Sequence, residues 1–265
     1  MYGLPSGARL VASTGRIVLF QGDAIVNAAS EDCLTGEELD SDISAAGGPE
    51  LHAARRALPR VPGSDNSGDG KRCRRGSAVV TVGGKLRAKW CIHAVGPDFK
   101  SAGEDPSTLA ACDGELFSAY GAALSVAKHT SFKTVAFAPI SASETFRGAR
   151  SLQRVMDLAV DGIADADYKG LEEVHVVASN DDQIAALLQA FVKHQQGFRA
   201  LEHGDDTTPD TFAEKKSSSS PRRATAAGPA RVADLKRFAG PARSSSLSVN
   251  GTAKVRMESH THAQE

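Results

Sequence analysis

The chain has 265 residues, of which 41% are apolar, and its formal net charge is -1 at pH 7. A chain of this size can bury a hydrophobic core in one domain of about 190 residues, with a further segment attached to that domain. It contains no apolar run of about 18 residues and no secretory signal at its start, so we expect an intracellular protein, cytoplasmic or nuclear, with no membrane partner.

Short runs rich in Val, Ile and Ala alternate along the chain with amphipathic stretches. The runs predict strands, and the stretches between them predict helices with one apolar face. The predicted strands cover residues 9–13, 17–20, 24–28, 77–82, 90–95, 134–140 and 174–178. The predicted helices cover residues 41–46, 49–57, 109–129, 152–164 and 181–193.

This order of elements predicts an α/β fold. Strands and helices alternate in the later part of the series, which implies parallel strands with helices on both faces of the sheet. The closely spaced strands at the front can pair antiparallel. We therefore expect a mixed, mostly parallel sheet.

From about residue 205 the composition shifts to Ser, Thr, Ala, Pro, Lys and Arg. We expect one domain over residues 1–204, followed by a disordered basic tail over residues 205–265. Ten basic residues stand between Lys215 and Arg256 against a single acid, Asp234. The stretch KKSSSSPRR is either a solvated linker or a patch for nuclear import or for nonspecific contact with nucleic acid.

The four cysteines and eight histidines show no spacing typical of a metal site. We interpret the cysteines as free thiols and expect no metal and no cofactor. The stretch GDGKR lacks the Ser or Thr that a P-loop requires, and no GxGxxG fingerprint follows a strand. His93, inside a predicted strand, is interpreted as an oriented core histidine.

Polar residues follow the strand predicted at 24–28. A loop that leaves the carboxyl end of a strand in an open α/β sheet is a usual place for a ligand, which makes Asn27, Ser30 and Asp40 candidates for a pocket. An Asn amide offers a donor and an acceptor to a ribose, and a carboxylate can orient a water. The alternatives are structural, with Asn27 as a turn residue and Asp40 as a helix cap.

Four sequence blocks together resemble the macrodomain family: DAIVNAAS from Asp23, LDSDISAAGGPEL from Leu39, WCIHAVGPDF from Trp90 and AFAPIS from Ala136. The resemblance covers roughly residues 9 to 200, with the blocks in the family's order. It implies a three-layer α/β/α sandwich with a mixed sheet. It also implies binding of ADP-ribose or an ADP-ribosylated protein, and some members of the family hydrolyse such molecules.

The resemblance implies roles for individual residues. Asn27 matches an Asn near the distal ribose, Ser30 stands where the family has a second Asn, and Asp40 matches the acid that positions the attacking water. Arg16 stands where the family has an Asp that accepts the adenine amine, and an arginine cannot accept that bond.

The resemblance also implies two phosphate-binding loops. Each departs from the family's glycine-rich pattern, and the first carries the carboxylates of Glu37 and Glu38. Arg147 in the second loop is expected either to meet phosphate oxygens or to pair on the surface. The implied ligand-binding residues are Ala28, Ala29, Thr35, Gly36, Ser141, Ala142, Ser143, Phe146, Arg147 and Gly148.

The leading hypothesis is therefore binding of ADP-ribose or an ADP-ribosylated protein, with hydrolysis through Asp40 of the ADP-ribosyl hydrolase or O-acetyl-ADP-ribose deacetylase type. On this hypothesis Asp40→Ala abolishes turnover and leaves the fold intact. The alternative is a catalytically inactive binding or interaction module. A third hypothesis gives the pocket another ligand, such as a nucleotide or the end of a nucleic acid, with attraction from the basic tail.

Overall fold

The computed structural model describes residues 1–36, 38–63 and 70–202, with the backbone alone for residues 38 and 197–202. The strands are β1 (Tyr2–Gly3), β2 (Arg9–Thr14), β3 (Ala24–Ala28), β4 (Ser77–Val82), β5 (Trp90–Val95), β6 (Thr134–Phe137) and β7 (Glu173–Ala178). The helices are α1 (Glu38–Ala57), α2 (Phe99–Ala102), α3 (Pro106–His129), α4 (Glu144–Arg147), α5 (Leu152–Asp165) and α6 (Asp181–Glu202). None of them, over the described residues, is long and apolar enough to cross a membrane. The predicted tail lies outside the described residues.

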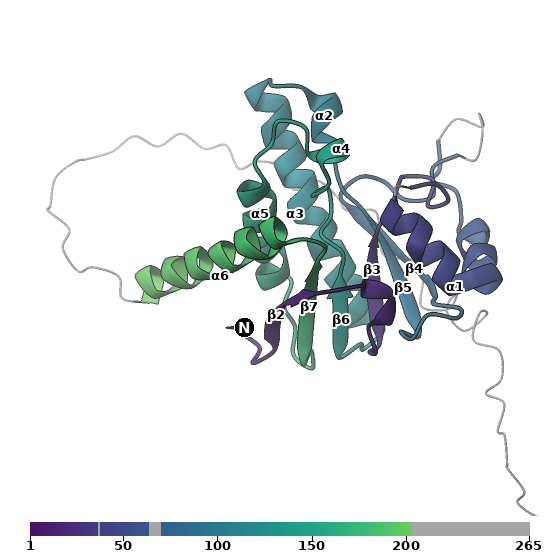
Figure 1. Cartoon of the computed structure of the whole chain (residues 1–265), viewed down its shortest axis with the longest axis horizontal. Coiled ribbons are helices and arrows are strands. Elements are labelled where there is room, and N and C mark those ends of the chain that lie inside the picture. The colour runs from purple at the N-terminus through teal and green to yellow at the C-terminus, as the bar shows by residue number, and fades with distance from the viewer. Residues whose placement is uncertain (37, 64–69, 203–265) are drawn as a thin grey trace, which may run out of the picture.

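The strands form one sheet in the order β1-β2-β7-β6-β3-β5-β4 (Figure 1). The pairs β1/β2 and β4/β5 are antiparallel, and the other neighbours are parallel. The prediction of a mixed, mostly parallel sheet is confirmed. The pairing expected among the front strands is wrong, because β7 and β6 lie between β2 and β3 and the antiparallel pairs are at the two edges.

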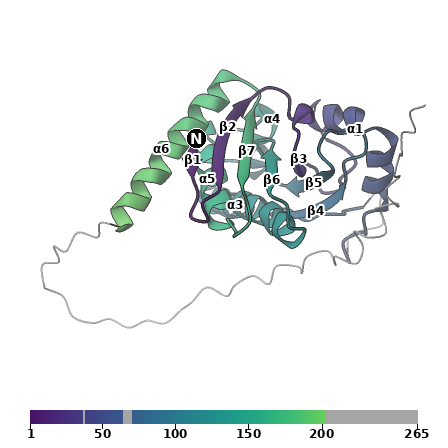
Figure 2. The same cartoon turned by 90° about the horizontal axis from the view of Figure 1, so that it is seen from below.

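Helices cover both faces of this sheet, which gives the three layers that the resemblance implies. Side chains alternate along β3, so that Ile25 packs under α1 with Ile43 and Leu51, while Ala24 and Val26 join the core of α3, α5 and α6. Figure 2 shows α1 on one side of the sheet and α3 on the other. The same alternation decides which polar side chains of β3 and β5 face α1.

Two predicted elements take a different form. Residues 17–20 were expected to be a strand, but Ile17–Leu19 forms a 3-10 helix, closed by a bond from Leu19 N to Arg16 O of 3.0 Å. The helices predicted at 41–46 and 49–57 form one element, α1, kinked at Gly48, where φ is 67°. Only glycine enters this region readily, and the kink brings the two halves of α1 over the same strands.

Candidate functional site

A cavity of about 570 Å³ opens where the parallel strands end. Its wall includes residues that end or follow five strands: Gly15 after β2, Ala28 on β3, Gly96 after β5, Ala138 after β6 and Ser179 after β7. Loops that leave the carboxyl ends of parallel strands meet at one edge, which is where open α/β sheets bind ligands. The volume suits a ligand the size of a nucleotide.

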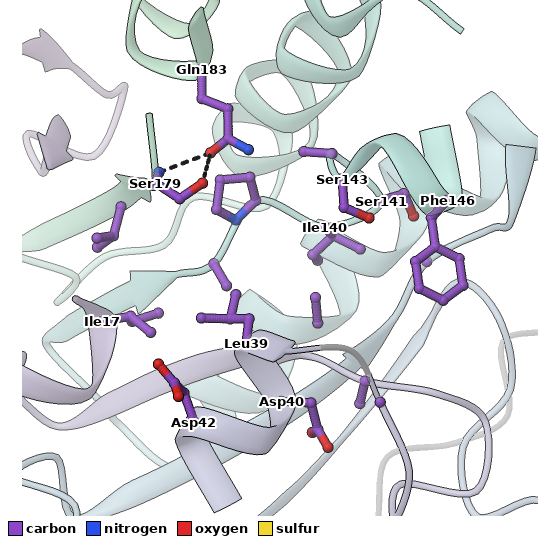
Figure 3. Close-up of a pocket in the computed structure, with 18 of the residues that line it drawn as sticks. Ile17, Leu39, Asp40, Asp42, Ile140, Ser141, Ser143, Phe146, Ser179 and Gln183 are labelled. Atoms are coloured by element: carbon purple, nitrogen blue, oxygen red, sulfur yellow. Dashed lines mark hydrogen bonds between the residues drawn. The ribbon is translucent and has the colours of Figure 1, made fainter. Parts of the chain in front are cut away.

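Most of the residues implied by the resemblance lie in this wall. They are Ala28, Ala29, Ser30, Gly36, Asp40, Ser141, Ala142, Ser143 and Phe146. Figure 3 shows Asp40 from α1 on one side of the cavity and Ser141, Ser143 and Phe146 above it. The other implied residues do not line the cavity, and the contacts described below explain the position of each. They are Asn27, Thr35, Arg147 and Gly148. Glu37 and the side chain of Glu38 lie outside the described residues.

Asp40 is held in a buried ion pair. Nη2 of Arg55 lies 2.7 Å from Oδ1 and 3.0 Å from Oδ2 of Asp40, and the two side chains are 1% and 4% exposed. Nδ2 of Asn27 also donates to Oδ1 of Asp40. Two buried charges of opposite sign stabilise each other only while both are present. The expectation that Asp40→Ala leaves the fold intact stays a prediction, but this ion pair argues against it, because the change would leave the Arg55 guanidinium without its charge partner.

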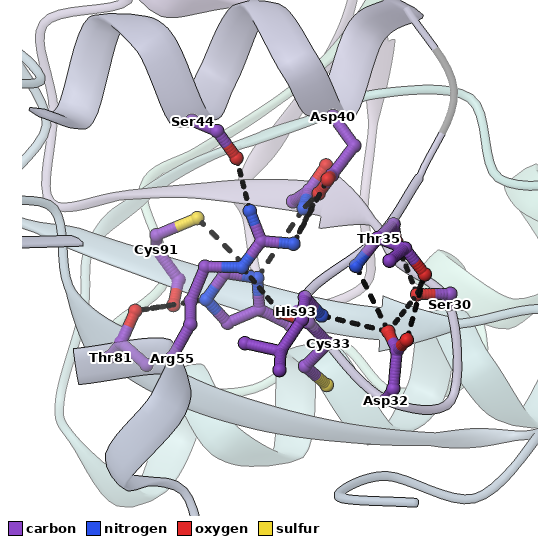
Figure 4. Close-up of polar contacts among 12 residues, drawn as sticks. Ser30, Asp32, Cys33, Thr35, Asp40, Ser44, Arg55, Thr81, Cys91 and His93 are labelled. Atoms are coloured by element: carbon purple, nitrogen blue, oxygen red, sulfur yellow. Dashed lines mark hydrogen bonds and ion pairs between the residues drawn. The ribbon is translucent and has the colours of Figure 1, made fainter. Parts of the chain in front are cut away.

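Arg55 ties this pair to the rest of α1 and to the loop after β3. Its Nη1 donates to Oγ of Ser44 and its Nε donates to the carbonyl oxygen of Cys33 (Figure 4). Asn27 and His93 are direct neighbours on β3 and β5 and both face α1. Asn27 is completely buried behind Asp40, which keeps it out of the cavity wall.

His93 extends the polar network into the sheet as a neutral side chain. Its Nε2 lies 2.9 Å from Oγ1 of Thr81, and its Nδ1 lies 3.4 Å from Nδ2 of Asn27. Burial, with the nearby charge of Arg55, lowers the pKa of His93 to about 3. The amide donor of Asn27 requires Nδ1 to be an acceptor, which the neutral ring provides. The interpretation of His93 as an oriented core histidine agrees with these contacts.

The loop between β3 and α1 is organised by Asp32, which the sequence reasoning did not single out. Oδ1 of Asp32 accepts from Leu34 N at 2.8 Å, Thr35 N at 3.0 Å and Oγ of Ser30 at 2.6 Å. Partial burial raises the pKa of Asp32, but these bonds outweigh it and lower the pKa to about 2. Thr35 is directed toward Asp32 through its Oγ1 and so lies outside the wall.

The second loop places its residues differently from the expectation for Arg147. Nη1 of Arg147 donates to the backbone oxygen of Arg150 at 2.9 Å, so the guanidinium is engaged beside the loop and does not line the cavity. Ser141 donates to the backbone oxygen of Pro97 at 2.7 Å and holds the loop against the end of β5. Gly148 packs against the backbone of Lys100.

Several wall residues were missed because they stand alone after strands or at a helix start. Asp42 of α1 lies 3.3 Å from Arg16, so a carboxylate remains on the side of the cavity where the family's Asp is replaced. Ser179, which follows β7, and Gln183, in the first turn of α6, also line the cavity. The ends of the parallel strands, as predicted from the sequence, are the signal by which these residues could have been identified. The other missed wall residues are Ile17, Val18, Leu39, Gly96, Pro97, Ala138, Pro139, Ile140 and Val177.

Comparisons with known proteins agree with this geometry. Residues 26–147 match the model of the Macro domain family. A macro domain-containing protein of Caldanaerobacter subterraneus subsp. tengcongensis is 32% identical over 67% of this chain and 92% of its own length. An O-acetyl-ADP-ribose deacetylase of Salmonella gallinarum is 31% identical over 72% of this chain and 97% of its own length.

The structures of known proteins show the same fold. An Oceanobacillus iheyensis macrodomain with ADP superposes with a TM-score of 0.62 at 22% identity, covering 74% of this chain and 97% of its own. The described strand order, the cavity at the strand ends and the relatives that align over nearly their whole length all lead to one assignment. The chain belongs to the macro domain family.

Proposed function

We propose that this chain binds ADP-ribose, free or attached to a protein, in the cavity at the strand ends. The observation that carries the proposal is the cavity itself, built by the loops after β3 and β6 that the resemblance assigns to the ligand. Relatives named as deacetylases of O-acetyl-ADP-ribose, and a structural neighbour with ADP, support the ligand class.

The cavity has a polar side and an apolar side that suit such a ligand. Ser30, Gly36 and Asp40 lie around the loop after β3, and Ser141 and Ser143 border the loop after β6. Small side chains at these positions let backbone groups approach an anionic ligand closely. In the proposed mode the diphosphate and distal ribose occupy this side.

Filling the cavity should abolish binding. Ser143 immediately precedes α4 and lines the cavity, so we expect the aromatic ring of Ser143→Phe to fill the space that the ligand would occupy. Thr145→Phe, on the exposed side of the same helix, is the matched control. Calorimetric titration of ADP-ribose should show saturable heat for the native chain and Thr145→Phe and none for Ser143→Phe. No heat from the native chain would overturn the proposal.

Hydrolysis is a second candidate function, favoured by the position of Asp40 in the wall and by the named activity of the deacetylase relatives. Arg55 and Asn27 hold the carboxylate of Asp40 in one orientation. In this proposal, Asp40 orients a water toward the anomeric carbon or the ester by accepting a hydrogen bond from it. The competing proposal is a catalytically inactive binding module, because Arg55 already donates hydrogen bonds to both oxygens of the Asp40 carboxylate and Asn27 to one of them, and these bonds give it a structural role.

Asp40→Asn separates these proposals. The amide keeps an acceptor toward Asn27 but loses the negative charge, and general-base groups typically contribute about 100-fold or more to the rate. We expect release of acetate from O-acetyl-ADP-ribose to fall by at least that factor in Asp40→Asn, while ADP-ribose affinity changes little. Native chain that binds ADP-ribose but releases no acetate and no protein-linked ADP-ribose would identify the binding module.

A further inference from the structure

We propose that Gln183 reads the base of the bound nucleotide, by donating a hydrogen bond from its amide nitrogen to an acceptor atom of the ring. This inference rests on the proposed binding of ADP-ribose and names the residue that distinguishes one base edge from another. It follows from the way the amide is held.

The orientation of the Gln183 amide is determined by Ser179. The backbone nitrogen of Ser179 lies 2.9 Å from Oε1 of Gln183, and Oγ of Ser179 lies 3.1 Å from the same atom (Figure 3). A backbone N–H can only donate, so the atom that faces it must be the amide oxygen. The amide nitrogen is thereby turned away from Ser179 as a donor with a fixed direction.

Gln183 itself is held in place by the start of α6. Its backbone nitrogen donates to Oδ1 of Asn180 at 2.9 Å, and its side chain is largely buried, with the residue 8% exposed. It nevertheless lines the cavity. A donor that is buried, directed and at the wall is preorganised for a ligand acceptor, because little side-chain entropy remains to be lost on binding.

This side of the cavity suits a planar base. Ile17, Val18, Ala138 and Val177 line it with aliphatic groups. In Figure 3, Ile17 and Gln183 lie on the side away from Ser143 and Phe146. A nucleotide that places its phosphates among the serines must place its base toward this apolar side.

The charged pair beside it is a weaker source of discrimination. The side chains of Arg16 and Asp42 are 65% and 50% exposed, so water screens their interaction and leaves both free to move. Adenine offers three ring nitrogens as acceptors, N1, N3 and N7. We therefore expect one of these nitrogens to accept the hydrogen bond from the Gln183 amide.

The test pairs a change in the protein with a change in the ligand, using ADP and its 1-deaza, 3-deaza and 7-deaza analogues. Gln183→Glu keeps an oxygen for Ser179 and replaces the donor with an acceptor, while Gln183→Met removes the donor without adding charge. Gln189→Glu adds the same charge at an exposed position of α6 and is the control. Because ADP and its analogues carry equal charge, the carboxylate that Gln183→Glu introduces affects all of them alike and cancels in the comparison.

We expect one analogue to bind the native chain about tenfold more weakly than ADP, the usual value of one well-formed hydrogen bond. Gln183→Met should lose about the same factor with ADP, Gln183→Glu should lose at least that factor because of its added charge, and neither variant should show a further loss with that analogue. Gln189→Glu should retain the native pattern. Losses that add independently, or equal binding of all analogues by the native chain, overturn the inference alone. A native chain that binds neither ADP nor ADP-ribose overturns the proposed function with it.

Discussion

Replacing Arg55 with Met is expected to destabilise the fold by about 3–5 kcal/mol. Arg55 is 1% exposed and is the charge partner of a carboxylate that is itself buried. The change leaves the charge of Asp40 in a low-dielectric site, and it also leaves the oxygens of Ser44 and Cys33 without the donors they now have. Urea unfolding at neutral pH, followed by circular dichroism, measures the loss.

Two further variants show whether charge pairing is the cause. Arg56→Met removes the same kind of side chain from the next, exposed position of α1 and should change the free energy of unfolding by less than about 0.5 kcal/mol. Arg55→Met combined with Asp40→Asn removes both charges and should recover most of the stability. A double variant as unstable as Arg55→Met alone would contradict the pairing explanation and make the packing of the long side chain responsible.

The buried pair also constrains how catalysis can be examined. Any substitution at Asp40 changes both the cavity wall and the electrostatic balance under α1, so loss of turnover in Asp40→Ala would not by itself identify a catalytic role. Asp40→Asn keeps the shape of the carboxyl group but leaves the charge of Arg55 unpaired, whereas the double variant with Arg55→Met removes both charges, so comparing the two variants separates the effects. The free energy of unfolding should therefore be measured for each variant together with its rate of turnover.

Local pattern was enough to predict much of the fold. β5 was predicted with its observed ends, Trp90 and Val95, because an apolar run is closed there by Gly96 and Pro97. The 3-10 helix at Ile17–Leu19 was missed because a few consecutive apolar residues satisfy one helical turn as well as a short strand. The two halves of α1 were separated at Gly48, which breaks the helix conformation without ending the element.

The position of the site could be predicted from the sequence, but most of the contacts within it could not. The rule that ligands lie at strand ends led to Ser30 and Asp40, and both line the cavity. The Arg55 pair was not predictable, because its partners lie 15 residues apart on either side of the Gly48 kink and share no local pattern. Gln183 was not predicted for a related reason. The orientation of its side chain depends on the backbone amide of Ser179, which follows a different element, β7.

The last prediction concerns pH. His93 is neutral in the fold, with a pKa lowered from 6.5 to about 3 by burial and by Arg55, whereas in the unfolded chain it titrates near its ordinary value. Between these two values the unfolded state binds a proton that the folded state does not. The contribution of His93 to the free energy of unfolding is therefore at its maximum above about pH 6.5. It falls as the pH is lowered toward 3, by up to about 1.4 kcal/mol per pH unit.

Lowering the pH from 7 to 4 should thus remove on the order of 3 kcal/mol through His93 alone. Carboxylates contribute to the lower part of this window, so the comparison that isolates His93 is the slope of unfolding free energy against pH in the native chain and in His93→Gln. The amide keeps a donor and an acceptor for Thr81 and Asn27 but does not titrate, and its slope should be shallower from pH 6.5 to 5. Equal slopes, or an imidazole resonance of His93 that titrates near pH 6.5 in the folded protein, would contradict the account, because each would mean that the folded chain binds a proton at His93 as readily as the unfolded chain does.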